Sequence, residues 1–271
     1  MEYFSFNSYA VAGSLEETYR IARDNGLYIE VSPLENDEFL ETTGIKPYSV
    51  HIDYRVHLTD PDKDIRDRDL DYCMKVLRKA HESGAKVCVL HVEEYIVDRP
   101  FEERVNTYIE TISPLIEKAD SYGIKIAIEN TLYRPGRICA TPEELKYVID
   151  RLKEKYSNVG ICLDSGHANI SAEDERTNFN GRLEDWLDYF RDDIIHVHLH
   201  ENHGKERKTE DGDILDEHLP PSGLFSDEFY KKLVNLPNLI TINFEINPEN
   251  CRGIDTILKA KEFTEKYIEI K

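Results

Sequence analysis

The chain has 271 residues, and its 34 basic and 54 acidic side chains give a formal net charge of −20. Proteins bind long polyanions such as DNA through a basic surface, so this charge argues against nucleic acid as a partner, although a local basic groove or bound divalent metals would change the balance. No apolar run approaches the ~18 residues of a membrane span, and no basic segment precedes an apolar one at the start of the chain. We therefore expect neither a membrane span nor a signal peptide.

The five cysteines are widely spread and include no Cys-x-x-Cys pair. This pattern is typical of a reduced cytoplasmic protein rather than of a disulfide framework or a thiolate zinc site. Composition alone does not decide whether the chain forms a homo-oligomer.

Short apolar segments alternate with amphipathic ones along the whole chain. The apolar segments are rich in Val, Ile and Leu, which is typical of strands buried on both faces of a parallel sheet. The amphipathic segments carry apolar residues at helical spacing. In chain order the expected strands are 3–6, 27–31, 47–52, 86–91, 124–129, 159–164, 194–199 and 239–246. The expected helices are 14–25, 64–83, 102–121, 142–155, 182–191, 226–235 and 254–268.

Local signals agree with these limits. Ser14 and Glu17 form a capping-box pattern, and Thr141 precedes a proline that suits the first turn of a helix. Segment 32–46 is predicted to be a short irregular connection. The element count predicts a single (β/α)8 TIM barrel, in one domain over residues 1–271. A doubly wound open sheet is the competing fold, but it usually carries a Gly-rich phosphate turn after an early strand, and none is present.

Ionizable side chains occur where the predicted strands end. A TIM barrel builds its active site from the C-terminal ends of its strands and the loops that follow them. The side chains at these positions are of types that bind divalent metals. They are His51, His91, Glu129, Asp164, His167, His198 and Glu245, and the loop after the seventh strand adds Asp216 and His218.

Each of these residues also has a purely structural interpretation. A single buried histidine is usually a hydrogen-bonded core residue, and Glu129 or Asp164 could cap the following helix. Taken together, however, so many buried carboxylates and imidazoles at one rim would need a cation or an extensive hydrogen-bond network. The pattern therefore predicts a metal site. We expect His196, one layer deeper, to be a hydrogen-bonded core residue, and the role of His200 stays open.

Several segments resemble the xylose-isomerase-like TIM-barrel superfamily, which groups sugar and sugar-phosphate isomerases and epimerases with endonuclease IV. They are IAIENT (126–131), ICLDSGHA (161–168), VHLHEN (197–202), DEHLPPSG (216–223) and NFEI (243–246). The resemblance implies one metal held by Glu129, Asp164, His198 and Glu245. The similarity to the ketose epimerases of this group further implies that Glu129 and Glu245 form the acid/base pair and that His167 binds substrate.

The endonuclease IV branch implies two further metal positions. One would be held by His51, His91 and Glu129, and the other by His167, Asp216 and His218. One to three ions are therefore implied, and clustered metals would suit hydrolysis of a phosphodiester. The nitrogen and oxygen ligands permit Zn²⁺, Mn²⁺, Co²⁺ or Mg²⁺, and the histidines favour Zn²⁺ or Mn²⁺.

The flanking sequence favours the isomerase branch. Endonuclease IV follows Glu-Asn-Thr with a small Gly-rich turn, whereas residues 132–135 here are Leu-Tyr-Arg-Pro. The epimerases often place an arginine six residues after the histidine of the seventh strand, and Gly204 stands there instead, which weakens ketose recognition by such an arginine.

The sequence thus predicts a metal-dependent isomerase or epimerase of a small sugar or sugar phosphate. We expect the metal to polarise a substrate carbonyl while Glu129 and Glu245 transfer the neighbouring proton. We expect His167 to orient hydroxyls and Arg134 or Arg137 to hold a phosphate. The alternatives are an endonuclease IV-like phosphodiesterase acting at abasic DNA sites and a non-catalytic barrel with a structural metal.

Overall fold

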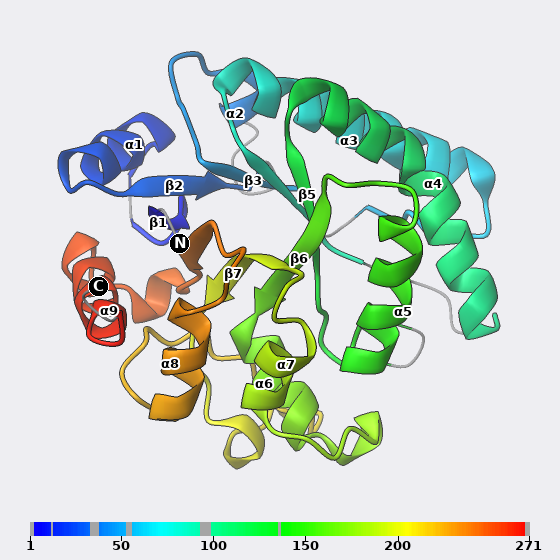
Figure 1. Ribbon diagram of the computed structural model, residues 1–271. Coiled ribbons are helices and arrows are strands. Elements are labelled where there is room, and N and C mark those ends of the chain that lie inside the picture. The colour runs from blue at the N-terminus through cyan, green and yellow to red at the C-terminus, as the bar shows by residue number, and fades with distance from the viewer. Residues whose placement is uncertain are drawn as a thin grey trace.

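Residues 3–11, 13–32, 38–52, 56–92, 99–134 and 137–268 are described by the computed structural model. Within them, eight parallel strands close into a barrel in sequence order (Figure 1). Strand β1 pairs with β8 as well as with β2, which closes the ring. The predicted TIM barrel is confirmed. The strands are β1 (Tyr3–Asn7), β2 (Tyr28–Val31), β3 (Ser49–Ile52), β4 (Val87–Leu90), β5 (Lys125–Glu129), β6 (Val159–Asp164), β7 (Ile194–Leu199) and β8 (Thr241–Phe244).

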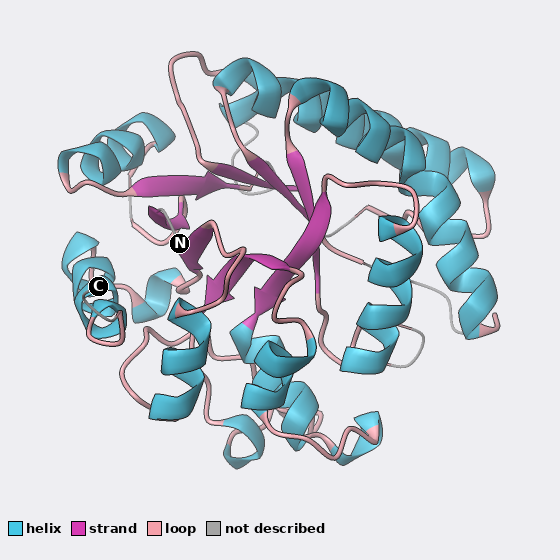
Figure 2. Ribbon diagram, viewed as in Figure 1, coloured by secondary structure: helices cyan, strands magenta, loops and turns pink. Residues whose placement is uncertain are grey.

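Helices surround the ring of strands (Figure 2). The Ser14 hydroxyl accepts a hydrogen bond from the backbone N–H of Glu17, as the capping pattern predicts. Gly84 and Gly123 end two long helices in the left-handed conformation, which glycine adopts without a steric penalty. The helices are α1 (Leu15–Asp24), α2 (Glu38–Glu41), α3 (Lys63–Ser83), α4 (Phe101–Tyr122), α5 (Pro142–Lys153), α6 (Ser165–Glu173), α7 (Leu183–Tyr189), α8 (Asp227–Val234) and α9 (Ile254–Glu265).

Two helices differ from expectation. Helix α6 follows β6 directly, and its buried residues are mostly small or polar, so it shows no amphipathic pattern in the sequence. Asp164 is the N-cap of α6 and accepts a hydrogen bond from the backbone N–H of His167, as the capping interpretation proposed. Segment 32–46 contains the short helix α2 where an irregular connection was expected, and its residues 33–37 lie outside the described residues.

Alternate residues of a strand face opposite sides of the barrel wall. On β7, Val197 and Leu199 belong to the large apolar cluster that includes residues of the surrounding helices. His196 and His198 therefore face the barrel interior. A smaller apolar cluster contains Tyr48, Val87, Val89, Ala127, Cys162 and Ile195.

The five cysteines are free thiols, and four of them are buried. Among the described helices, none is long and apolar enough to cross a membrane.

Candidate metal centre

Four side chains from neighbouring strands meet at the C-terminal end of the barrel. Glu129 ends β5, Asp164 ends β6, His198 lies near the end of β7, and Glu245 follows β8. One ligand atom from each lies within 4.8 Å of the others. Nδ1 of His198 lies 3.0 Å from Oε2 of Glu245, 3.3 Å from Oε1 of Glu129 and 3.9 Å from Oδ2 of Asp164.

The chemistry of this group fits a divalent cation. Two buried carboxylates and a third that is 12% exposed surround a single buried imidazole. Such a concentration of negative charge is costly unless a cation compensates it. Carboxylate oxygen and imidazole nitrogen are ligands of Zn²⁺, Mn²⁺, Co²⁺ and Mg²⁺. Glu129, Asp164, His198 and Glu245 would therefore hold a divalent ion.

The other ligand candidates surround this group. Nε2 of His51 lies 3.0 Å from Oε2 of Glu129. His91, Glu129 and His167 each have one potential ligand atom within 4.8 Å of the others. Oδ2 of Asp216 lies 3.3 Å from Nε2 of His167 and 3.0 Å from Nε2 of His218. The structure therefore brings together all the residues that the strand ends and the following loop indicated.

The grouping differs in two respects from the endonuclease IV pattern. The group that contains Asp216 and His218 includes His200 instead of His167. The endonuclease IV pattern also joins His51 and His91 at one metal with Glu129. Here the ligand atoms of His51 lie close to those of Glu129 and His198, whereas the ligand atoms of His91 lie close to those of Glu129 and His167. The rings of His51 and His91 lie 6.2 Å apart, centroid to centroid.

His200, whose role the sequence left open, lies against the centre. Its Nε2 lies 3.0 Å from both carboxylate oxygens of Asp164. Its ring stacks on that of His218, with centroids 3.9 Å apart. His200 therefore links one candidate ligand to the Asp216–His218 pair.

Backbone geometry near His200 depends on a glycine. A Cβ atom at Gly166, in the first turn of α6, would lie 2.0 Å from Cε1 of His200. Gly166→Ala is therefore expected to push His200 away from Asp164 and to lower the free energy of unfolding by about 1–3 kcal/mol, as overpacking does. Denaturant unfolding of chelator-treated protein measures this. In a His200→Ala background the same substitution should cost much less, and an equal cost in both backgrounds would contradict this explanation.

Charge coupling shifts the pKa values of the centre in opposite directions. Burial alone would raise the pKa values of Glu129 and Glu245, but the facing imidazole of His198 holds both well below their usual range. Burial alone would lower the pKa of His51, yet Glu129 raises it to about 9. Burial likewise opposes, and the carboxylates nevertheless raise, the pKa values of His167 and His218 to about 10. Without a cation, protonated histidines therefore balance the carboxylates.

The stability of metal-free protein is expected to fall as the pH rises from neutral. A histidine whose pKa is raised by folding stabilises the fold fully below its unfolded pKa of about 6.5, and this contribution disappears as the pH rises through its folded pKa. For His51 that occurs near pH 9, and for His167 and His218 near pH 10. Urea unfolding in chelator between pH 6.5 and 10 measures the effect. A free energy of unfolding that does not change over this interval would contradict the coupling.

The centre opens into a cavity of about 430 Å³. Arg137 lines this cavity, whereas Nη1 of Arg134 is paired with Asp213 at 3.2 Å, and Arg134 is not among the lining residues. Of the two arginines expected to hold a phosphate, Arg137 is therefore the one that lines the cavity. The lining residues are Tyr9, His51, His91, Glu129, Leu132, Arg137, His167, Asp216, His218, Glu245 and Asn247.

Sequence reasoning missed several residues that contact the candidate ligands, and Tyr9 and Glu30 are two of them. Tyr9 donates a hydrogen bond from its hydroxyl to Oε1 of Glu245 at 3.3 Å. Glu30 of β2 is buried below the centre, where its Oε1 lies 2.9 Å from Nε2 of His198. The sequence does show Glu30 as one acidic residue inside an apolar strand. A buried acidic side chain needs a polar partner, so this residue could have been singled out.

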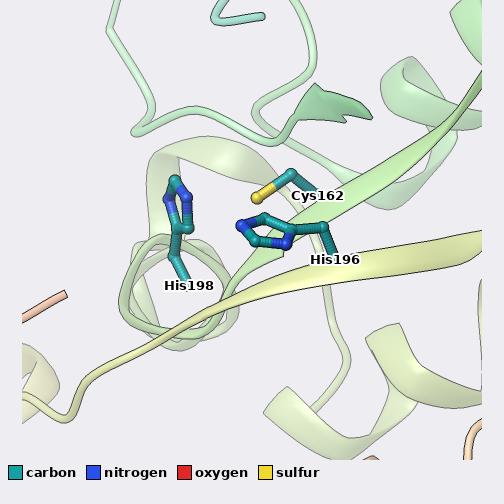
Figure 3. A group of neighbouring side chains, drawn as sticks. All are labelled: Cys162, His196 and His198. Carbon is teal, nitrogen blue, oxygen red and sulfur yellow. The ribbon is translucent and has the colours of Figure 1, made fainter. Parts of the chain in front are cut away.

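Cys162, His196 and His198 form a further group of potential ligands in the barrel interior (Figure 3). Nε2 of each histidine lies 2.9 Å from a carboxylate oxygen of Glu30, so both nitrogens are already engaged. Burial raises the pKa of the Cys162 thiol, which keeps it protonated and a poor metal ligand. This group is therefore part of the polar support beneath the centre, in agreement with the expectation that His196 is a hydrogen-bonded core residue.

Comparison with known proteins gives both sequence relatives and similar structures. An uncharacterized protein of Methanocaldococcus jannaschii is 30% identical over 209 residues, which are 76% of this chain and 64% of that protein. A probable endonuclease 4 of Mycoplasmoides gallisepticum is 26% identical over 171 residues, which are 63% of this chain and 54% of that protein. The chain thus spans less than two thirds of the length of either relative.

Two of the similar solved structures illustrate how the fold extends over almost the whole chain. A D-tagatose 3-epimerase-like protein aligns with a TM-score of 0.74 and 23% identity, covering 99% of this chain and 97% of that one. The IOLI protein with a bound zinc atom aligns with a TM-score of 0.71 and 18% identity, covering 99% and 100%. At these identities the likeness shows the fold alone. The family model described as xylose isomerase-like TIM barrel matches residues 14–266, and the chain therefore belongs to that family.

Proposed function

We propose that the protein is a divalent-metal-dependent isomerase or epimerase of a small sugar or sugar phosphate. The observation that carries this proposal is the cavity of about 430 Å³ above the four-residue group, with Glu129 and Glu245 in its lining. Pockets of roughly 300–1,000 Å³ suit small molecules. Among the described residues that line it, Arg137 is the sole lysine or arginine, which suits one anionic group better than a polyanion.

The proposed reaction is a proton transfer beside a carbonyl. A bound divalent ion would supply Lewis-acid polarisation of that carbonyl. Glu129 or Glu245 removes the proton from the adjacent carbon, and the other glutamate returns a proton on the opposite face or at the neighbouring carbon. His167 orients the substrate hydroxyls, and Arg137 binds a phosphate when the substrate carries one.

Similar proteins support the metal and the substrate class in general terms. The solved structures of this fold include a D-psicose 3-epimerase with D-tagatose, at 13% identity and a TM-score of 0.71. They also include the IOLI protein with zinc. A divalent metal and a small sugar-like substrate are therefore the expectation for this chain.

A specific observation favours a second candidate, an endonuclease IV-like phosphodiesterase. His51, His91, Asp216 and His218 surround the four-residue group and would provide ligands for further ions. Clustered ions stabilise both the attacking and the leaving oxygen of a phosphodiester. The relatives named probable endonuclease 4 point the same way.

Two measurements separate the candidates. Metal analysis of purified protein should give about one ion per chain for the isomerase and about three for the phosphodiesterase. Incubation in D₂O with a panel of ketoses and ketose phosphates should introduce deuterium next to the carbonyl. Nicking of a duplex with an abasic site, without exchange into any sugar, would overturn the proposal.

A further inference from the structure

Glu30 occupies the layer of the barrel directly below the candidate metal centre. Its side chain is 1% exposed. Oε1 lies 2.9 Å from Nε2 of His198 and accepts a hydrogen bond from Nδ2 of Asn243 at 3.2 Å. Oε2 accepts a hydrogen bond from Oγ of Ser49 at 2.6 Å and lies 2.9 Å from Nε2 of His196. Each carboxylate oxygen therefore has two partners.

We propose that Glu30 is a positioning residue that presents His198 to the metal. This inference rests on the metal centre of the proposed function and assigns a residue outside its ligand set. A neutral imidazole carries one N–H, and the nitrogen that lacks hydrogen is the one that can bind a metal. Nε2 of His198 lies in ion-pair contact with Oε1 of Glu30 at 2.9 Å, and this negative charge favours the N–H on Nε2. The lone pair is then on Nδ1, the atom that faces Glu129 and Glu245. Carboxylates commonly orient metal-binding histidines in this way.

A second path connects Glu30 to another candidate ligand. Asn243 donates hydrogen bonds from Nδ2 to both Glu30 and Oδ1 of Asn7. Asn7 in turn donates from Nδ2 to Oε1 of Glu245 at 3.2 Å. Oδ1 of Asn243 accepts from Oγ of Ser5 at 2.9 Å, which fixes the orientation of the amide. Glu30 therefore supports His198 directly and Glu245 through two buried amides.

The barrel topology explains how Glu30 of β2 contacts histidines of β7, which is far away in the sequence. Strands β2 and β7 are not neighbours in the barrel (Figure 1). A side chain from β2 reaches His196 and His198 only across the interior, and glutamate is long enough to contact both imidazoles at 2.9 Å. An aspartate there would be shorter by one methylene group.

The test is Glu30→Gln, which keeps the size of the side chain but replaces one acceptor oxygen with a donor. Zn²⁺ affinity, measured by competition with a chelator, is expected to fall about 10–100-fold, as it does when comparable supporting residues are lost. The visible absorption of Co²⁺-loaded protein is expected to change as well, because the position of His198 in the ligand field changes. Neither readout depends on turnover.

Thr241→Val is the matched control. Thr241 pairs with His196 in the β7–β8 register, and its buried hydroxyl has no hydrogen-bond partner among the described residues. This variant should keep the wild-type Zn²⁺ affinity and Co²⁺ spectrum. Ser49→Ala removes one support of Glu30 without touching a candidate ligand, and it should weaken Zn²⁺ binding in the same direction by a smaller factor.

The outcomes distinguish this inference from the proposed function. If Glu30→Gln lowers the stability of metal-free protein but binds Zn²⁺ within twofold of wild type with an unchanged Co²⁺ spectrum, Glu30 has only a structural role. If Glu30→Gln does not fold, wild-type Zn²⁺ affinity in Ser49→Ala overturns the inference. Failure of metal-loaded wild-type protein to exchange sugar protons would instead refute the isomerase proposal and leave the role of Glu30 intact.

Discussion

The Glu245→Gln variant is expected to exchange deuterium into a ketose about 10²–10⁴-fold more slowly than wild type at saturating metal. This factor is the usual contribution of a general acid or base. Glutamine keeps the shape of the side chain and one carbonyl oxygen but cannot accept and return a proton. Glu129→Gln should show a loss of similar size, because the proposed reaction needs a proton acceptor and a proton donor. Exchange is measured by mass spectrometry or NMR after metal content has been verified for each variant.

A third buried carboxylate provides the control for this prediction. Glu184 of α7 is 8% exposed and accepts a hydrogen bond from Oγ of Ser226, outside the cavity. Glu184→Gln should keep the wild-type exchange rate, even if it unfolds more easily. If both active-site variants retain metal and exchange at the wild-type rate, the acid/base assignment is wrong.

The strands could be predicted because their apolar runs reflect a physical requirement. A strand covered on one side by helices and on the other by the barrel interior must be apolar over most of its length. Helix α6 escaped prediction for the opposite reason. Its buried residues include Ser165, Gly166 and His167, which lie beside the candidate metal centre, so no hydrophobic period marks the helix.

The rim residues could be predicted because parallel strands all point their C-terminal ends at the same opening. Strand limits alone therefore placed His51, Glu129 and Asp164 together. Glu30 lies one layer deeper, and its partners come from β3, β7 and β8. Nothing local in 27–31 indicates those partners, because they are fixed only when the barrel closes.

His200 marks a different limit. His200 follows the last residue of β7, two positions after His198, and the sequence left its role open. Whether His200 binds metal, substrate or protein depends on the close approach of α6, which a glycine at 166 permits. Such an approach cannot be read from spacing.

His198→Ala is expected to have the largest effect on stability of any single substitution in the centre. In metal-free protein, removal of this imidazole leaves Glu30, Glu129 and Glu245 without the buried partner that now lies 2.9–3.3 Å from each. Loss of one member of a buried ion pair typically costs about 3–5 kcal/mol. Urea unfolding in chelator at neutral pH should show a decrease of that size, and Zn²⁺ binding should weaken at the same time because a ligand is lost.

The pH dependence of the penalty identifies its cause. Without His198, burial raises the pKa values of Glu129 and Glu245, so the folded variant binds protons more tightly than the unfolded chain, and its stability rises as the pH falls. The difference from wild type should therefore shrink between pH 7 and pH 5. His203→Ala removes the partner of Glu217 in a 2.7 Å pair outside the four-residue group and should cost far less. If the loss in free energy of unfolding stays constant from pH 7 to pH 5, its cause is a packing defect. That result would contradict the proposal that protonated His198 stabilises these carboxylates until a metal ion replaces its proton.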